Sequence, residues 1–480
     1  MATTDSSSSK PFRVIVVGAG VVGLTFAHAL RLANIEHVVL EKHDKIVSLK
    51  GAALVIWPQV ARIFDQFGFM HKIHETTTPL IREFRRWPDG SVHSAGSTST
   101  QIAAMFGLPS VLTDRQTLVR HLYDNLADKS TIRTSTRVSH IEHTEDGVRV
   151  HLADGSVEEG DMVIGADGVH SVVKEQIWKY AEKHEPGTIP ESDKNAIFTQ
   201  FAGIFGVSDA KDSFGLSASE TNVQYGIDHT QLVFTQPGVV YWAIIFKDEF
   251  SQPPKKRNAT EADMQAMAKR FADIPLTETL KFADIWETRS RYGLLNIEEG
   301  VLEKWHSGRL VLCGDSAHKM TADLGLGANI AIESAVSLAN ILQRELKSNL
   351  NRHPSKSELA AMFAEYQKDR FVRSKAFVEI SGKATRMHTY QTYFGRFFVS
   401  YIAPLMTAVQ VKKLAEALAK APKLNYAPVH HINENAEGWQ LGKKSEKKKS
   451  SVGWITYALL TSTIGVTIAY VVTTGRPALF

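Results

Sequence analysis

The fold of this chain is decided by residues 13–41, RVIVVGAGVVGLTFAHALRLANIEHVVLE. The stretch opens with a β-branched apolar run that is short enough to form a strand buried on both faces. Gly18, Gly20 and Gly23 follow directly, and an apolar helical pattern and a second strand-like run then lead to Glu41. A strand, a G-x-G-x-x-G turn, a helix and an acidic residue in this order are the fingerprint of a dinucleotide-binding unit.

Each residue type in this stretch has a physical reason. Gly18 makes the tight turn, Gly20 lets the backbone approach a pyrophosphate, and Gly23 lets the helix lie close to the strand. The first turn of the helix offers free N–H groups and a partial positive charge to phosphates, and the Glu41 carboxylate can accept hydrogen bonds from a ribose diol. The alternative is an ordinary glycine-rich turn, and the motif alone does not distinguish FAD from NAD.

Length and composition narrow the class of protein. A chain of 480 residues can form two or three domains around a substantial core. The net charge of +4 is small and no dense basic and aromatic tract occurs, so we expect no nucleic-acid partner. Cys313 is the only cysteine, which excludes an intramolecular disulfide and favours a reducing compartment. No His/Cys cluster has a metal-ligand spacing, so we predict no metal site.

Further regions show how the chain is organised. Residues 161–171, DMVIGADGVHS, predict a buried strand that runs into a second glycine turn and a helix, and residues 309–318 predict a last core strand that ends in GDSAH. Residues 190–290 contain four strand-like runs separated by Gly, Asp and Pro, which predict a mostly antiparallel sheet suited to roof a substrate pocket. Residues 92–105, rich in Ser, Thr and Ala, indicate a loop or edge excursion, and residues 397–421 a helix.

The three glycine turns occur in a characteristic order. GAGVVG with Glu41, GADGVHS at 165–171 and GDSAH at 314–318 together resemble the FAD-dependent aromatic-hydroxylase-like monooxygenases. Within that family the chain is most similar to fungal epoxidases that act on prenylated natural products, namely meroterpenoids and indole diterpenes. The resemblance covers residues 10–350. It implies an α/β fold, in which a Rossmann-like FAD-binding domain is interleaved with a mostly antiparallel β-sheet substrate domain.

The resemblance assigns cofactor contacts to several residues. Asp315 of GDSAH would contact the ribityl chain of FAD, and Asp167 of GADG would support FAD and the approach of the nicotinamide cofactor. Arg115 stands in the first turn of a predicted helix, where a positive charge does not help the helix dipole and is usually a solvated side chain. The resemblance instead places Arg115 near the FAD phosphates. It also implies a backbone contact near Val55, where relatives usually carry Gly.

A long predicted helix begins near Gly327 and Ala328, and the resemblance implies that its N-terminus points at the flavin pyrimidine ring, where the reduced flavin carries negative charge. The chain departs from the family pattern close to this helix. Ala322 stands where Pro is common, Leu326 where Gln is common, and Ser334 where Asp is common. Because the surrounding framework is intact, we expect FAD binding, and the detailed flavin contacts are the part of the prediction that these departures weaken.

The chemistry implied by the resemblance comes from the cofactor rather than from a protein nucleophile. NADPH or NADH would reduce FAD, O₂ would add to give a flavin C4a-hydroperoxide, and an olefin of a small apolar prenylated substrate would be epoxidised. Tyr225, on a predicted strand, lies where similar proteins place a tyrosine that faces the pocket, and it is the candidate catalytic residue. An ordinary core tyrosine is the alternative. His318, beside the proposed flavin site, is either a proton relay or a structural histidine.

Two other functions stay open. The same FAD framework would serve a hydroxylase or dehydrogenase of an aromatic or alkaloid ring, and only the shape of the pocket separates that enzyme from an epoxidase. The departures at residues 322, 326 and 334 also leave open a membrane-tethered flavoprotein that does not oxygenate and acts as a scaffold. A flavin halogenase is disfavoured, because the chain contains no Trp-x-Trp-x-Ile-Pro signature.

The C-terminal tail forms a separate unit. A lysine-rich run at residues 443–449 precedes residues 452–472, which carry no charge and would extend, at about 1.5 Å per residue, over roughly the 30 Å of a bilayer core. We predict a transmembrane helix there, with an apolar docking helix as the alternative. Because positive residues favour the cytoplasmic side, we expect an intracellular membrane, the endoplasmic reticulum, with the catalytic body facing the cytosol.

The predicted domains follow from these units. The substrate domain is inserted twice into the FAD-binding domain, and the helical region and the tail come after both. The boundaries are 10–80, 110–185 and 290–350 for the FAD-binding domain, 81–109 and 186–289 for the substrate domain, 351–425 for the helical region, 426–451 for a basic linker, and 452–472 for the transmembrane helix.

Overall fold

The computed structural model describes residues 10–47 and 53–446 of the chain. One of its two large layers is a six-stranded sheet with the order β17-β18-β11-β1-β2-β7, in which every neighbouring pair except β17 and β18 is parallel. Its central strands are buried, as the β-branched pattern predicts. The strands are β1 (Arg13–Val17), β2 (Glu36–Leu40), β7 (Ile132–Arg133), β11 (Met162–Gly165), β17 (His306–Ser307) and β18 (Leu310–Leu312).

Helices and smaller sheets cover this first layer. α1 (Val21–Leu32) packs against both α10 (Gly327–Leu346) and α5 (Arg115–Asp124), and α6 (Val172–His184) contacts β11 and β18. These elements enclose one large apolar core. The other elements of this half are β3 (Ala53–Ile56), which pairs with β6 (Val111–Asp114), the antiparallel trio β8 (Val138–His143), β9 (Val148–Leu152) and β10 (Val157–Gly160), and the helices α2 (Pro58–Gln66), α3 (Met70–Thr76) and α7 (Glu191–Lys194).

The second layer is an eight-stranded sheet with the order β19-β16-β12-β15-β14-β13-β4-β5, antiparallel except for the pair of β13 and β4. α8 (Glu261–Phe271) and α9 (Phe282–Glu287) cover its outer face through a cluster that contains Trp242 and Trp286. The strands are β4 (Arg82–Arg86), β5 (Val92–Gly96), β12 (Ile197–Asp209), β13 (Glu220–Gly226), β14 (His229–Gln236), β15 (Val239–Ser251), β16 (Arg289–Val301) and β19 (His318–Lys319).

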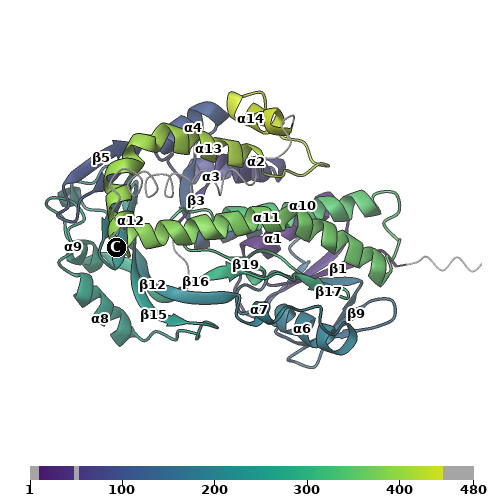
Figure 1. Ribbon diagram of the computed structural model, residues 1–480. Coiled ribbons are helices and arrows are strands. Elements are labelled where there is room, and N and C mark those ends of the chain that lie inside the picture. Colours follow the sequence, from purple (N-terminus) through teal and green to yellow (C-terminus); the bar gives the residue numbers. More distant parts are fainter. Residues whose placement is uncertain (1–9, 48–52, 447–480) are drawn as a thin grey trace, which may run out of the picture.

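One long helix, α11 (Lys356–His388), runs across both layers (Figure 1). Its 33 residues extend over about 50 Å. Where α11 crosses α10, Arg370 and Arg373 donate to the Glu333 carboxylate at 2.9 and 2.7 Å. Burial opposes the charge on Glu333, but the two guanidinium groups outweigh burial and hold the pKa of Glu333 below its usual value. This buried charged cluster fixes α11 on the helix that begins at the predicted flavin site.

Residues 92–105 follow the edge excursion, one of the two predicted alternatives, rather than a loop. The chain forms the edge strand β5 and then α4 (Thr98–Phe106). The N–H groups of Thr98 and Ser99 donate to the Glu83 carboxylate at 3.2 and 2.6 Å. Because the group that binds the helix N-terminus comes from β4 rather than from the preceding residues, the local signal for a helix start is missing from the sequence.

Residues 393–419 form a bent helical run rather than one regular helix. Pro404 lies in its middle and lacks the N–H that a continuous helix would need there. Within the part of the chain that the structure describes, this is the one run that is long and apolar enough to cross a membrane, judged by length and composition alone. Its parts are α12 (Tyr393–Phe397), a π-helical turn (Phe398–Ile402), a 3-10 turn (Ala403–Met406) and α13 (Thr407–Ala419).

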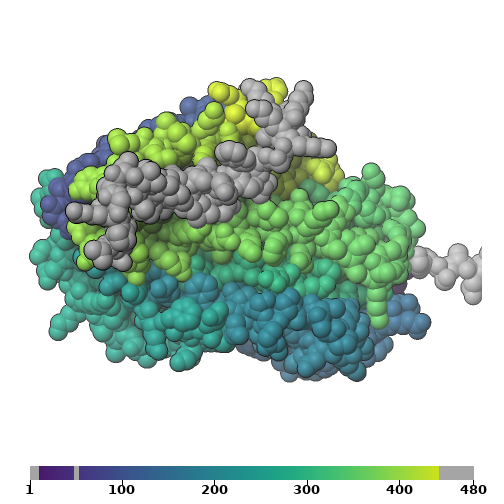
Figure 2. Space-filling view, in the orientation of Figure 1, coloured from purple at the N-terminus to yellow at the C-terminus, as the bar shows by residue number. Residues whose placement is uncertain are grey.

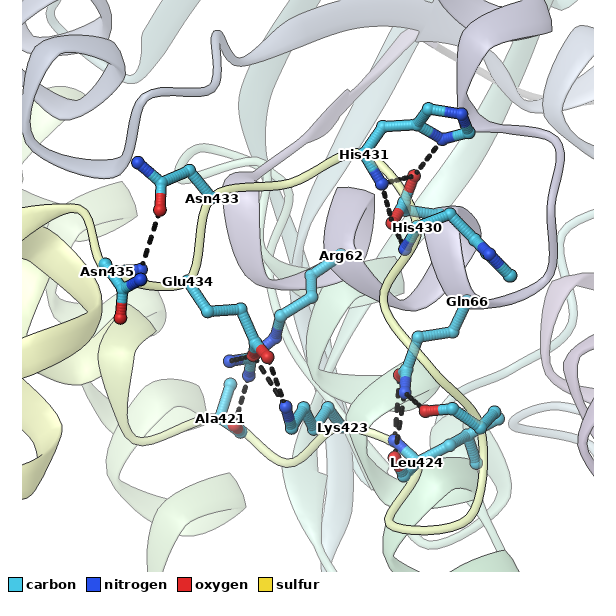
Figure 3. A network of polar contacts seen from close by, with 12 residues as sticks. Arg62, Gln66, Ala421, Lys423, Leu424, His430, His431, Asn433, Glu434 and Asn435 are labelled. Carbon is cyan, nitrogen blue, oxygen red and sulfur yellow. Dashed lines mark hydrogen bonds and ion pairs between the residues drawn. The ribbon is translucent and has the colours of Figure 1, made fainter.

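The segment after α13 is tied to α2 (Figure 3). Arg62 of α2 donates to the Ala421 carbonyl at 2.9 Å and pairs with Glu434 at 3.3 Å. Gln66, one turn further along α2, donates to the Leu424 carbonyl at 2.8 Å and accepts from the Leu424 N–H at 2.9 Å. A segment distant in sequence is therefore fixed to a helix of the first layer by polar contacts.

The helix α14 (Glu437–Glu446) continues this docked segment. The ring of Trp439 meets the ring of Phe106 edge-on, with the centroids 4.6 Å apart. The described part of the predicted basic linker therefore lies on the body of the protein. The predicted transmembrane helix, residues 452–472, lies outside the described residues.

Candidate active site

The first glycine turn lies between β1 and α1. Gly18 has a φ of +100°, and a Cβ on Gly23 would lie 1.8 Å from the Gly18 carbonyl oxygen, so the turn closes in this form only with glycine at position 23. The Glu41 carboxylate follows β2 and accepts hydrogen bonds from the N–H groups of Ala19 and His43, each at 2.9 Å. Glu41 is therefore held against the turn, where a ribose bound there would meet it.

The other two glycine turns adjoin the first one. A Cβ on Gly18 would lie 2.7 Å from the Ala166 carbonyl oxygen, so the GADG turn touches the GAGVVG turn. A Cβ on Gly314 of GDSAH would lie 2.8 Å from Val22 of α1 and 3.2 Å from Ala331 of α10. Because β1, β11 and β18 are parallel neighbours, the three turns meet at the carboxyl ends of these strands, where α/β sheets bind ligands.

Two acidic side chains in these turns have different surroundings. Asp167 Oδ2 accepts the N–H of Val172 at 2.7 Å at the start of α6, and burial raises the pKa of Asp167. Asp315 is 38% exposed and forms an ion pair with Lys319. Burial would raise the pKa of Asp315, but the Lys319 ammonium outweighs it and holds that pKa below its usual value. Asp315 is therefore an anion that the site presents, whereas Asp167 stabilises its own turn.

Arg115 brings a positive charge to the first glycine turn. It is the first residue of α5, whose N-cap Asp114 accepts the N–H of Thr117 at 3.0 Å. A Cβ on Gly20 would lie 3.3 Å from Nη2 of Arg115, and the charge of Arg115 also lowers the pKa of Asp315. Together with the free N–H groups at the start of α1, Arg115 creates a positive region at the place where the sequence motif predicts phosphates.

The start of α10 faces β3. Gly327 and Ala328 form its first turn, which has no side-chain cap within the described ranges. The Asn329 amide donates to the Val55 carbonyl at 2.8 Å and accepts the Trp57 N–H at 3.1 Å, so it fastens β3 to α10. Sequence reasoning missed Asn329. Its partners Val55 and Trp57 lie more than 270 positions away, and the one local signal is a polar residue within an apolar helical pattern.

These residues fit FAD on their own chemistry. The glycine turn leaves no room for a Cβ at Gly18 or Gly23, and Glu41 offers carboxylate oxygens for a ribose. Arg115 and the start of α1 would hold a diphosphate, and the partly exposed Asp315 would accept hydrogen bonds from a ribityl chain. The first turn of α10, at Gly327 and Ala328, would face the negative end of a reduced isoalloxazine.

Tyr225 lies on the second large sheet, near the end of β13. Its ring stacks on that of His388, the last residue of α11, with centroids 4.1 Å apart and planes 10° apart. Burial raises the pKa of Tyr225 to about 12, against an opposing effect of Arg85, so the hydroxyl stays protonated and can donate a hydrogen bond. His388 Nδ1 in turn lies 3.6 Å from Oδ1 of Asp323, whose side chain is 1% exposed. Asp323 belongs to the loop that leads into α10.

The face of the second sheet that carries Tyr225 is mostly apolar, with Thr221 and Thr230 as polar members. We call it the inner face, opposite the face covered by α8 and α9. Phe234 and Tyr241 of this face pack against a cluster that contains Val55 and Leu326, so the inner face adjoins β3 and the start of α10. The strand register aligns its members in two rows, Val223 with Leu232 and Ala243, and Phe234 with Tyr241.

His318 is enclosed by side chains. Its Nε2 lies 3.1 Å from Oγ of Ser334, which also accepts from Arg370 at 3.3 Å, and its ring lies beside that of Trp305. Burial, aided by the charge of Arg370, lowers the pKa of His318 to about 4. A neutral histidine with these contacts favours the structural alternative over a proton relay. Ser334, one of the three departures from the family pattern, is part of the same packing.

Comparisons with known proteins agree with this geometry. Residues 12–357 match the family described as FAD binding domain. The chain is 34% identical to an FAD-dependent monooxygenase of Penicillium shearii over 436 residues, which cover 90% of this chain and 89% of the relative. It is also 34% identical to an FAD-dependent monooxygenase of Penicillium brasilianum over 466 residues, which cover 96% and 95% of the two chains.

A solved structure shares the fold. HpxO of Klebsiella pneumoniae, in its crystal structure with FAD and uric acid, superposes with a TM-score of 0.67 at 21% sequence identity, covering 86% of this chain and 97% of HpxO. The family match and the relatives span most of the chain, and the glycine turns of the chain form one site. The chain therefore belongs to the FAD binding domain family, and it is an FAD-dependent monooxygenase.

Proposed function

We propose that this monooxygenase uses NADPH or NADH and O₂ to epoxidise an olefin of a small apolar, prenylated natural-product intermediate. The observation that carries the proposal is the apolar inner face beside Tyr225. Four of its side chains are only partly buried, and they would offer an isoprenoid chain a surface that excludes water: Val223, Phe234, Tyr241 and Ala243.

The charged groups at the border of the inner face support an uncharged substrate. Arg291 pairs with Asp114 at 3.4 Å, and burial raises the pKa of nearby Tyr241 to about 12. These groups therefore neutralise one another or stay uncharged at neutral pH. Arg85 brings one positive charge to the edge of the face, because it lies opposite Val223 in the register of β4 and β13. That charge adjoins the Tyr225 hydroxyl.

The tasks of this chain in the proposed reaction are binding, orientation and exclusion of water. FAD, when bound, supplies the electrons taken from the nicotinamide and activates O₂. The inner face would hold the isoprenoid chain, and the Tyr225 hydroxyl would donate a hydrogen bond to oxygen at the reacting carbon atoms. Stacking on His388, whose Nδ1 lies 3.6 Å from Oδ1 of Asp323, orients the Tyr225 ring.

The test uses the full chain in detergent. We expect flavin bands in the visible spectrum, NADPH oxidation in air that is stimulated by a prenylated aromatic, and a product that has gained one oxygen atom and lost one olefin. A ring-hydroxylated product with an intact olefin would favour the hydroxylase alternative. Bound flavin without stimulated NADPH oxidation across a panel of such substrates would contradict the proposal and favour a scaffold.

For the location of the enzyme we propose an intracellular membrane, the endoplasmic reticulum, with the body facing the cytosol. The support is the uncharged stretch at residues 452–472 and the lysine-rich run before it. The measurement is resistance of the membrane-bound protein to carbonate extraction, together with protease digestion of sealed microsomes. Protection of the body from protease would contradict the orientation.

A further inference from the structure

The C-terminal helical run carries a row of exposed apolar side chains. Their relative exposures are 86, 53, 57, 83 and 49% in chain order. They recur at every fourth position, so each member lies on the same face of the run as the next one. Scattered apolar side chains on a surface are ordinary, whereas a continuous row marks a contact surface. We call this row the apolar stripe; its members are Tyr393, Phe397, Tyr401, Leu405 and Val409.

The opposite side of the same run packs on the body. Val411, Ala415 and Leu418 are buried in the cluster that reaches the start of α10. Nε2 of His93 on β5 lies 2.7 Å from the Ser400 carbonyl oxygen. The run therefore cannot cross a bilayer without leaving the body. An amphipathic helix of this kind lies in the plane of the membrane interface.

The composition of the stripe matches that interface. Three of its five side chains are aromatic, the class enriched where a bilayer meets water. Between residues 391 and 420 the sequence holds one acidic residue, Glu416. The basic residues of the same segment favour anionic headgroups, and they are Arg396, Lys412, Lys413 and Lys420.

We propose that the apolar stripe lies on the surface of a lipid bilayer that carries anionic headgroups, so that the body contacts the membrane directly in addition to its predicted anchor. This inference rests on the membrane location proposed above. The path of the chain supports it, because a Cβ on Gly442 of α14 would lie 2.8 Å from the Ala419 carbonyl oxygen. That point is about 15 Å along α13 from Val409, and the uncharged residues 452–472 follow shortly after it.

The stripe adjoins the substrate face. α11 ends at His388, which stacks on Tyr225, and the stripe begins after a short turn at Tyr393. At the other border, the ring of Tyr401 lies 6.1 Å from that of Trp87, which directly follows β4. Figure 2 shows α11, α12 and α13 as a light-green band above the teal residues of the second sheet. A substrate dissolved in the bilayer would thus meet the enzyme close to Tyr225.

The docking test uses the full chain and one surface label. Because Cys313 is buried, a cysteine introduced as Leu405→Cys can be labelled alone with a polarity-sensitive fluorophore. On vesicles of phosphatidylcholine and phosphatidylserine with a spin label on the acyl chains, we expect a blue shift and a severalfold loss of emission. The matched control is Lys179→Cys on the exposed side of α6, which should show neither change.

Three outcomes would overturn the proposal. The first is vesicle-bound protein whose probe at position 405 is not quenched, and the second is failure of the full chain to bind these vesicles. The third is a probe that is already shielded without vesicles, since a second copy of the chain or its own residues 452–472 would then cover the stripe.

A kinetic arm separates this proposal from the proposed function. Leu405→Glu should lower turnover of a prenylated substrate delivered in vesicles severalfold and leave turnover in detergent micelles unchanged. Equal losses in both media would contradict delivery through the stripe. Absence of turnover by the parent chain in both media, with quenching at position 405 intact, would count against the epoxidase and leave the docking surface standing.

Discussion

The cofactor turns and the inner face of the second sheet are under different constraints. At Gly23 the nearest neighbour of an added Cβ is a backbone oxygen, which cannot give way. On the inner face the neighbours are side chains such as Val223 and Phe234, and apolar side chains of similar volume exchange at modest cost. The cofactor is therefore set by backbone geometry that leaves a motif in the sequence, whereas the proposed substrate surface consists of side chains that no motif records.

The largest expected effect comes from a substitution that disrupts the cofactor turns and leaves the inner face intact. In Gly23→Ala the new Cβ would lie 1.8 Å from the Gly18 carbonyl oxygen, so the turn must open. We expect purified protein without flavin absorbance and with a lower midpoint of thermal unfolding. Gly68→Ala is the control: Gly68 has open space around its Cβ, and its φ of +85° strains the backbone of a replacement residue, so this variant should lose stability but keep its flavin. Stoichiometric flavin in Gly23→Ala would contradict the assigned turn.

The next largest effect is expected when single charged groups are removed from the cofactor site. Hydrogen bonds to a charged group contribute roughly 1.5–3 kcal/mol, so Glu41→Ala and Asp315→Ala should each weaken FAD binding roughly 10- to 100-fold. Titration of the apoprotein with FAD measures this. Glu36→Ala removes the same charge from the exposed start of β2 and should keep the affinity of the parent. If both site variants bound FAD as the parent does, the assignment would be wrong.

A smaller effect is expected from a substitution on the inner face that leaves the cofactor site unchanged. Tyr225→Phe keeps the ring that stacks on His388 and loses one hydrogen-bond donor, so substrate-stimulated NADPH oxidation should fall about 2- to 10-fold while FAD content stays unchanged. Tyr241→Phe is the matched control, a tyrosine of the same face with a similarly raised pKa. Equal effects on kcat and KM in the two variants would show that Tyr225 has no special role.

The last prediction concerns the stability of the packing beneath the site rather than cofactor binding or turnover. Below its ordinary pKa of 6.5, His318 binds a proton in the unfolded chain, whereas the folded chain binds it only near pH 4. The contribution of neutral His318 to the free energy of unfolding is therefore complete above pH 6.5. It is lost as the pH falls towards 4, by at most about 1.4 kcal/mol per pH unit. The free energy of unfolding by urea should fall less steeply over this range in His318→Asn. Identical slopes would contradict the buried neutral state.

The sequence predicts the glycine turns and three of the strands, because each of these elements depends on residues that are neighbours in the chain, such as a glycine at a positive φ, a β-branched run or a turn residue. The predicted strands are 198–207, 222–227 and 239–246. Contacts made by distant segments were not readable. Asn329 donates a hydrogen bond to Val55 of β3, and Glu83 of β4 accepts the N–H of Ser99 at the start of α4. Nothing in a local pattern indicates such a partner.

The surroundings of Tyr225 show still more clearly that contacts between distant segments cannot be predicted from local sequence. Tyr225 was named by resemblance, but its stacking on His388 and the neighbouring Asp323 join a sheet, the end of a long helix and a loop. The sequence predicts a helix at residues 397–421 but not the apolar stripe, because the exposed side of that helix depends on how it packs. The roles of the site residues and the membrane helix at 452–472 stay predictions.

The contacts between α2 and the segment after α13 decide where the chain can be shortened. Arg62 is 6% exposed, and its guanidinium group donates to Ala421 and pairs with Glu434, while Asp65 is 3% exposed and accepts the N–H of His430 at 2.6 Å. A chain cut at the end of α13 would remove the hydrogen-bond and ion-pair partners of both charged groups, which costs stability. A truncated form that retains the catalytic body therefore ends after Glu446.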